Sequence, residues 1–253
     1  MPLATYPELL RIAERAQWSE EAVDLEPDRA AWPALGRGVR EALEALLAGF
    51  LLGEQAVARD IAAFPAAARE RHLAACLTVQ EGDERRHARF MARVHERVLG
   101  EPAPAALVAA RARVPAALVE LLDGELPART ARLLDAPAEL PQAAALYHGI
   151  VEGVVFLAGQ AELIERLERV DRLPGLLDGV RRMQRDERWH VALGARLLAE
   201  HGGGDDDAMR RAAESALGAW GDAVSDPVRR WALAALERRL ATQAPRPSSR
   251  RLS

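Results

Sequence analysis

The pattern Asp-Glu-x-x-His occurs twice in this chain, at residues 83–87 and again at residues 186–190. Each copy lies in a long stretch where apolar residues recur at helical spacing. Residues three apart on an α-helix lie about 60° apart in projection, so the Glu and the His of each copy point from one face toward one point. Each copy therefore predicts a long helix that can grip one metal ion.

Two further acids interrupt segments that are otherwise apolar. Glu54 lies in AGFLLGEQAV and Glu152 lies in IVEGVVFLAG, and both segments have the composition of a core helix. Because burying an unpaired carboxylate costs several kcal/mol, acids on such helices need a shared partner, and a metal ion is the simplest one. The predicted metal ligands are Glu54, Glu84, His87, Glu152, Glu187 and His190.

The ligand set also indicates which metals would bind. Four carboxylates balance the charge of two divalent ions, and oxygen and nitrogen donors suit iron or manganese better than soft thiolate metals. One Glu from each of two helices and Glu-x-x-His from each of two others is the arrangement of dimetal carboxylate bundles. The alternative is that His87 and His190 are ordinary surface residues of charge-rich helices, but the repeated spacing favours a metal site.

Proline and glycine divide the chain into helices, because both residues interrupt the helical pattern. The stretch 103–137 contains four prolines, which allow only shorter helices and make it the crossover between two halves. The prediction is an all-α fold, a ferritin-like four-helix bundle with additional flanking helices. The four long helices are expected at residues 38–63, 66–99, 140–169 and 174–201.

Two flanking helices are expected towards the C-terminus, one after the acidic run 205–207 and one begun by residues 225–227. The tail 243–253 has no apolar periodicity and is predicted to be disordered. Residues 1–242 are predicted to form a single domain.

Composition narrows the function classes. The chain is rich in helix formers and has only 4% aromatic residues, and its net charge of -4 gives no basic surface for nucleic acid. All 34 basic residues are Arg, which indicates a compositional bias, so the pair Arg85-Arg86 is not interpreted as a phosphate site. The single Cys76 is expected to be buried. No run approaches the roughly 20 apolar residues of a membrane span, and a cytoplasmic location is expected.

From about residue 18 to residue 201 the chain resembles the ribonucleotide reductase small-subunit superfamily of ferritin-like proteins. The resemblance implies that Glu54, Glu84 and His87 serve one metal and that Glu152, Glu187 and His190 serve the other, with Glu84 and Glu187 placed to bridge. It also implies that Asp186 hydrogen-bonds the imidazole of His87, with Trp18 beyond it, and that the protein is a homodimer.

Within the superfamily, the reductase branch stores a radical on a Tyr four residues after the first ligand His, where this chain has Met91. The basic tail also lacks the aromatic character of the reductase tail. R2-like ligand-binding oxidases are the better match, because their pattern includes residues equivalent to Val57 and Tyr147. This resemblance implies a Mn/Fe centre that activates O2, a Val57–Tyr147 ether cross-link and a bound long-chain fatty acid.

Several alternatives stay open. The centre could hold Fe/Fe, and the chain could be a reductase small subunit without the usual radical Tyr, an iron-binding ferritin-like protein or a structural bundle. His148 lies four residues before Glu152, so it could be a third imidazole, although a supporting or surface role is favoured. His72, His95 and His201 have no acid at the matching spacing and are expected to be solvated.

Overall fold

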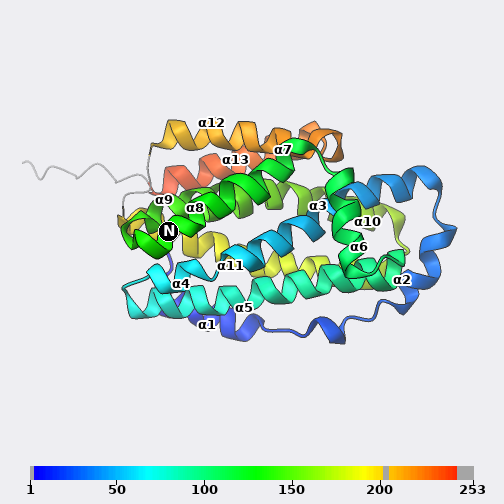
Figure 1. Ribbon diagram of the computed structural model, residues 1–253, viewed down its shortest axis with the longest axis horizontal. Helices are drawn as coiled ribbons and strands as arrows, with labels where there is room; N and C mark the ends of the chain where they lie inside the picture. Colours follow the sequence, from blue (N-terminus) through cyan, green and yellow to red (C-terminus); the bar gives the residue numbers. More distant parts are fainter. Residues whose placement is uncertain (1–2, 202–204, 244–253) are drawn as a thin grey trace, which may run out of the picture.

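A computed structural model describes residues 3–201 and 205–243 of the chain. All regular secondary structure in these two ranges is helical, and neither contains a strand. The predicted all-α bundle with flanking helices is therefore confirmed (Figure 1). The predicted tail lies outside the described residues except for Gln243, the last residue of α13.

Four long helices form the core of the molecule. The first two are α3 (Arg37–Asp60) and α5 (Arg71–Val94). The third runs without a break through α9 (Leu140–Ala144), η6 (Ala145–Phe156) and α10 (Leu157–Val170), and the fourth is α11 (Pro174–His201). Packing of α3 on α5, of α11 on η6 and α10, and of α10 on α3 closes the bundle.

Two predicted helix boundaries were wrong. The first long helix ends at Asp60 and a separate short helix, α4 (Ala63–Ala67), holds Pro65 in its first turn, where proline's missing N–H costs nothing. The second long helix begins at Arg71 rather than at residue 66, because the Glu70 side chain accepts a hydrogen bond from the Leu73 N–H and caps the helix there.

The third core helix contains a long π-helical segment. Over η6 the backbone is wound more loosely than an α-helix, and at its end the Leu157 N–H donates to the Glu152 carbonyl, five residues back. Such segments are uncommon and often lie at functional sites. A shorter π-helical turn, η3 (His95–Leu99), ends the second core helix at Gly100, whose φ of 76° favours glycine.

The crossover consists of short helices, as the prolines predict. These are α6 (Ala103–Arg113), α7 (Ala116–Val119), η4 (Glu120–Glu125), α8 (Leu126–Asp135) and η5 (Pro137–Glu139). Helix α6 packs on α3, and α8 packs on α4. The crossover therefore covers the side of the bundle formed by the first core helix.

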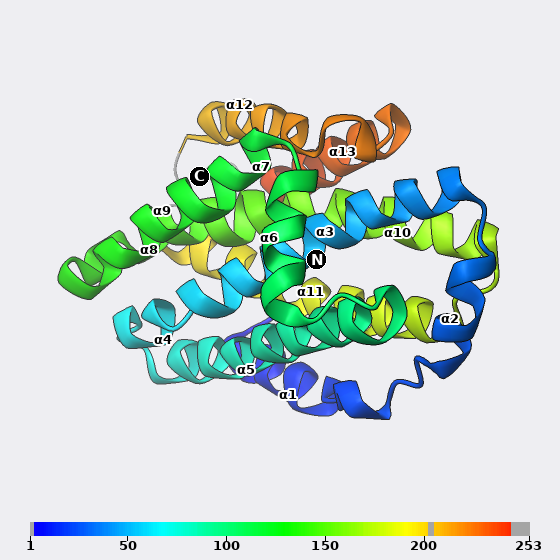
Figure 2. The ribbon, with the colours of Figure 1, turned by 45° about the vertical axis from the view of Figure 1, so that its right-hand side comes forward.

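Helices at the two ends of the chain cover opposite sides of the bundle (Figures 1 and 2). On one side α1 (Tyr6–Ala16) packs on α5 and α11. On the other side α12 (Asp206–Leu217) and α13 (Asp226–Gln243), joined by η7 (Gly218–Ala223), pack on η6. The two predicted flanking helices are thus present.

Three short elements link α1 to α3 and help to position the fourth core helix. They are η1 (Glu20–Ala22), α2 (Glu26–Ala31) and η2 (Trp32–Ala34). The buried carboxylate of Asp28 accepts hydrogen bonds from the backbone N–H groups of Gly175 at 2.9 Å and Leu176 at 2.7 Å. These two groups lie in the first turn of α11, where no backbone carbonyl can reach them, so α2 caps α11.

The segment Pro137–Val170 is long and apolar enough to cross a membrane by length and composition alone. However, 67% of its most apolar window is buried inside the bundle. Its hydropathy is therefore accounted for by its place in the core.

Candidate metal centre

The six predicted ligand side chains meet in the middle of the bundle, although they come from four helices. Each is at most 2% exposed. Their oxygen and nitrogen atoms form two overlapping groups whose members lie within 4.8 Å of one another. Glu84 and Glu187 belong to both groups. The groups are Glu54, Glu84, His87 and Glu187, and Glu84, Glu152, Glu187 and His190.

Both imidazoles present Nδ1 to the acids. Nδ1 of His190 lies 3.0 Å from Glu84, 3.4 Å from Glu187 and 3.5 Å from Glu152. Nδ1 of His87 lies at 3.5 to 3.7 Å from oxygens of three acids, Glu84, Glu187 and Glu54. One nitrogen of each ring therefore faces the centre, and the other faces outward.

Most polar atoms at the centre have no hydrogen-bond partner in residues 3–201 and 205–243, which tests whether the residues suit metal ions. Buried polar groups are almost always hydrogen-bonded, so each atom without a partner needs an explanation. Seven such atoms converge here, and all are oxygen or nitrogen atoms of kinds that bind iron and manganese. They are both oxygens of Glu54, both oxygens of Glu187, Oε2 of Glu152, and Nδ1 of His87 and of His190. The residues fit a pair of divalent ions.

The pKa values at the centre show how strongly burial acts there. Burial raises the pKa of Glu54 to about 8 and that of Glu152 well above its usual value. Burial alone would lower the pKa of His190, but the neighbouring Glu84 and Asp83 raise it well above the ordinary value. Glu54 and Glu152 are thus costly to keep ionised without a cation, and metal ions would supply that charge.

An outer acid holds the far nitrogen of His87, as the resemblance implies. Nε2 of His87 lies 3.1 Å from Oδ2 of Asp186, and the indole N–H of Trp18 donates to the same oxygen at 2.6 Å. A hydrogen bond from Nε2–H to this carboxylate leaves Nδ1 free to bind a metal. The structure thus places the Asp186 side chain beside His87 and Trp18 beside Asp186, and their supporting role stays a prediction.

Asp83 lies at the equivalent place on the other half of the centre and was not among the predicted residues. Its Oδ2 lies 3.3 Å from Nε2 of His190 and accepts a hydrogen bond from the indole of Trp189 at 3.2 Å. The signal was present in the repeat, because Asp precedes Glu in both copies of the pattern. Applying the role of Asp186 to both copies would have found Asp83.

Tyr147 contacts the centre from η6. Its hydroxyl donates to Oε1 of Glu84 at 2.9 Å and accepts from the amide of Gln80 at 3.4 Å. The Gln80 amide also donates to Oε1 of Glu152 at 2.8 Å. Burial, and then the charge of Glu152, raise the pKa of Tyr147 well above its ordinary value. The phenol therefore keeps its proton and points it at a predicted ligand.

His148 is buried and supports this network instead of joining either group of ligands. Its Nε2 lies 3.0 Å from the side-chain amide oxygen Oε1 of Gln80, and burial lowers the pKa of His148 to about 3. A neutral ring that donates to this oxygen leaves the Gln80 amide to face Glu152 and Tyr147. The buried position of His148 agrees with the predicted supporting role and not with the predicted surface role.

Val57 lies on α3 one turn after Glu54 and is fully buried, as is Met91 at the position of the reductase radical Tyr. Cys76 is buried as expected. The prediction of a solvated His95 was wrong, because its ring is fully buried between the Leu47 carbonyl at 3.2 Å and Glu101 at 3.2 Å. Glu101 reaches His95 only because the chain reverses at Gly100, which no residue spacing reveals.

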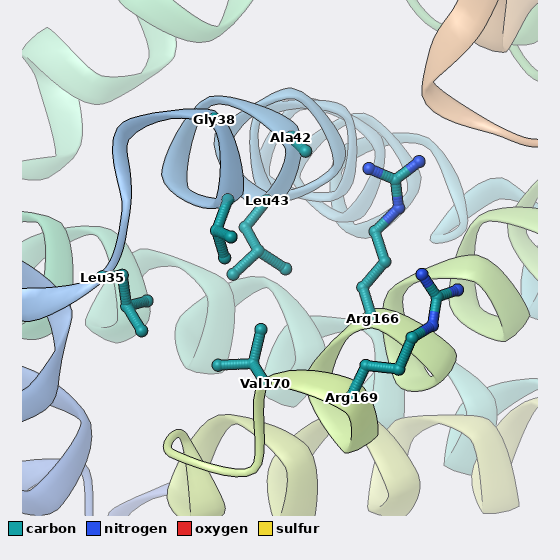
Figure 3. A pocket seen from close by; sticks show the side chains of 8 residues that line it. Leu35, Gly38, Ala42, Leu43, Arg166, Arg169 and Val170 are labelled. Carbon is teal, nitrogen blue, oxygen red and sulfur yellow. The ribbon is translucent and has the colours of Figure 1, made fainter.

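A surface groove between the start of α3 and the end of α10 has a volume of about 420 Å³ (Figure 3). Leu35, Leu43 and Val170 form its apolar side, and two arginines extend along the other. Both arginines already pair with acids of their own helix, Arg166 with Glu162 and Arg169 with Glu165, each at 2.8 Å. None of the predicted ligands lines this groove.

Comparisons with known proteins give a family and a fold. The family model for the small chain of ribonucleotide reductase matches residues 5–216. A solved R2-like ligand-binding oxidase variant with anaerobically reconstituted Mn/Fe cofactor matches with a TM-score of 0.80 and 21% identity, over 94% of each chain. Another variant, with aerobically reconstituted Mn/Fe cofactor, gives 0.78 and 21% over 94% of each chain.

A third variant of this kind, with a non-activated Mn/Mn cofactor after aerobic reconstitution with Mn and Fe, gives a TM-score of 0.79 and 21% identity. The match covers 94% of this chain and 93% of that one. The fold of the chain is therefore that of proteins whose solved structures carry paired transition metals.

Proposed function

This chain belongs to the family of ribonucleotide reductase small chains, and within that family we propose that it is an O2-dependent oxidase with a manganese–iron pair. The metals are held by Glu54, Glu84, His87, Glu152, Glu187 and His190. Its substrate is a C–H bond, either of a bound hydrophobic ligand resembling a fatty acid or of Val57 itself. A pair of iron ions is the alternative cofactor.

The observation that carries this proposal is the set of seven buried oxygen and nitrogen atoms that lie together without a hydrogen-bond partner in the described residues. A structural bundle would gain stability by replacing such residues with apolar ones. When bound, the metal pair in its reduced form supplies two electrons to O2 and a strongly oxidising centre. The protein's part is to hold the ligands rigid and to exclude water.

Tyr147 and Val57 support the oxidase assignment over the reductase one. Met91 cannot store a tyrosyl radical, whereas the hydroxyl of Tyr147 already donates to Glu84 at 2.9 Å. In the proposed cross-link, Val57 loses a hydrogen from a side-chain carbon and Tyr147 loses its hydroxyl hydrogen as the C–O bond forms. The two side chains give up two electrons and two protons. With two electrons from the metals and two protons from solvent, O2 is reduced to two waters.

The test is to load metal-free protein with Mn²⁺ and Fe²⁺ without O2 and then admit air. Peptide mapping is expected to show the Val57 and Tyr147 peptides joined with the loss of two hydrogen atoms. Tyr147→Phe should abolish the link. Tyr6→Phe is the matched control and should retain it, since Tyr6 instead donates to Glu200 at 2.7 Å. An unmodified Tyr147 peptide after complete metal oxidation would exclude the cross-link.

A reductase small subunit without the usual radical Tyr is the second candidate. The hydrogen-bonded series Trp18–Asp186–His87, which connects a half-buried indole to the centre, favours it because such a series could carry an electron. A purified reductase large subunit is the probe. Stable association, with nucleotide reduction that depends on both chains, would support this candidate over the oxidase.

A further inference from the structure

Arg86 lies in the first Asp-Glu-x-x-His copy, in the arginine pair that was attributed to compositional bias. It is 5% exposed, whereas the neighbouring Arg85 is at the surface and pairs with Glu81 at 2.5 Å. One terminal nitrogen of Arg86, Nη2, donates both to Oδ1 of Asp83 at 2.6 Å and to Oδ2 of Asp186 at 2.9 Å. A single guanidinium thus joins acids from two helices.

Each of these two acids holds one ligand imidazole. Asp83 lies 3.3 Å from Nε2 of His190, and Asp186 lies 3.1 Å from Nε2 of His87. A ligand imidazole needs an acceptor at its far nitrogen, because that hydrogen bond fixes the ring and directs the lone pair of Nδ1 at the metal. The orientation of both ligand rings therefore depends on where the two acids lie.

The acids need a cation to stay where they are. Both are fully buried, and two carboxylates close to one guanidinium repel each other once it is removed. Gln17 accepts from the other terminal nitrogen of Arg86 at 2.9 Å, and the guanidinium carbon lies 5.0 Å from the centre of the Trp18 ring. Arg86 is itself held in place, so it can serve as a fixed point for the acids.

We propose that Arg86 is a positioning residue shared by both metal sites, which fixes His190 through Asp83 and His87 through Asp186. The inference rests on the proposed function in one respect, that the two histidines bind metal. It has a specific consequence. Loss of either acid weakens one metal position, whereas loss of Arg86 weakens both together.

The experiment is an anaerobic titration of metal-free protein with Mn²⁺ alone, followed by calorimetry and by the EPR signal of free Mn²⁺. The wild type is expected to bind two ions per chain. Asp83→Asn and Asp186→Asn should each lower the affinity of one ion by about tenfold or more, and Arg86→Gln should lower both. Arg85→Gln is the matched control, since it removes a surface arginine, and should leave both affinities within about twofold of wild type.

Nitrogen-15 chemical shifts of the two ligand imidazoles in metal-free protein give a second readout. In the wild type the Nε2–H of both rings should show the shift of a hydrogen bond to a carboxylate. Arg86→Gln should disturb this state in both rings, and each Asp→Asn change should disturb it in one ring only.

Wild-type affinity at both positions in Arg86→Gln would overturn the inference, as would weakening of one position only. Arg86→Lys decides the matter if the Gln variant does not fold. Lysine keeps the charge, but its ammonium group lies only about where the guanidinium carbon of Arg86 lies, so both metal affinities should fall. Wild-type affinities in Arg86→Lys would then overturn the inference. A wild type that folds but binds no Mn²⁺ would overturn the proposed function, and this inference with it.

Discussion

Glu54 is a buried carboxylate with neither oxygen hydrogen-bonded in the described part of the chain. A group in this state lowers the stability of the metal-free protein, because its desolvation is not compensated. Under the proposed function metal binding reverses this, since the same two oxygens would become ligands. Glu54 is therefore expected to lower the stability of the metal-free protein and to raise its affinity for metal.

Replacing Glu54 with Met, which has a similar size, is expected to raise the free energy of unfolding of the metal-free protein. The gain should be about 1–3 kcal/mol, because a buried unpaired acid is exchanged for an apolar side chain. The same variant should bind no more than one metal ion tightly. Urea unfolding with a chelator present and a Mn²⁺ titration measure the two effects. A less stable metal-free variant would contradict the account.

The residues that meet at the centre could be predicted from the sequence because an acid in an apolar helix has few explanations. Asp83 was accessible to the same reasoning, since it repeats the position of Asp186. The burial of Arg86 was not, because the long side chain of arginine reaches solvent or core depending on what packs around it. The same holds for His95, whose partners come from another helix and from beyond a turn.

The π-helical segment η6 is the element on which Tyr147, His148 and Glu152 all lie. The Leu157 N–H donates to the carbonyls of Glu152 and Val154 but not to that of Gly153, which lies between them. Gly153 instead accepts a hydrogen bond from Arg239 of α13 at 2.6 Å. A flanking helix thus satisfies a carbonyl in the loosened part of a core helix.

Gly153→Ala is expected to destabilise the protein by about 1–3 kcal/mol. A Cβ atom there would lie 2.6 Å from the His148 carbonyl oxygen and 3.0 Å from the Arg239 guanidinium, so backbone and guanidinium would both have to move. Gly82→Ala is the control, because a Cβ at that exposed helical position meets nothing within 4 Å. It should stabilise α5 by about 0.5–1 kcal/mol. Equal effects of the two changes in urea unfolding would refute this reading of η6.

Glu162 attaches the last helix to the bundle, because it accepts from the Ser225 N–H at 2.9 Å and from Arg166 at 2.8 Å. Burial alone would raise the pKa of Glu162, but the Ser225 and Arg166 hydrogen bonds lower it below the usual value. Because the pKa is lower in the folded state, this carboxylate stabilises the protein at neutral pH. That contribution is lost as the pH falls through the lowered folded pKa.

Glu162→Gln should therefore cost about 1 kcal/mol or more at pH 7, and the deficit should shrink as the pH falls into the acid range. Unfolding in urea at several pH values, with a chelator present, measures it. The nearby Glu165→Gln breaks only an exposed pair with Arg169 and should change stability by less than about 0.5 kcal/mol. A loss of stability that increased as the pH fell would contradict this role of Glu162.

The helices and their order followed from the sequence because proline, glycine and helical periodicity mark them directly. The π-helical segment did not, because nearly every residue of IVEGVVFLAG is apolar and no face of the helix can be distinguished. The start of α5 was missed since its cap is Glu70, which is not among the usual capping residues. In both places the local backbone conformation determined the structure, and the residue pattern did not reveal it.

At the scale of the whole molecule, each of the four core helices contributes at least one residue to the centre. Metal ions bound there would join both halves of the bundle across the crossover, and binding would be linked to folding. Arg86 already joins the same halves through two acids. The dimetal site and the bundle are thus parts of one arrangement.

The direct measurement is anomalous diffraction at the Mn and Fe edges from crystals of protein loaded with both metals. We expect two peaks per chain. One lies among Glu54, Glu84, His87 and Glu187, and the other among Glu84, Glu152, Glu187 and His190. Fully loaded crystals that show no peak within these residues, or metal ions bound only elsewhere, would contradict this expectation.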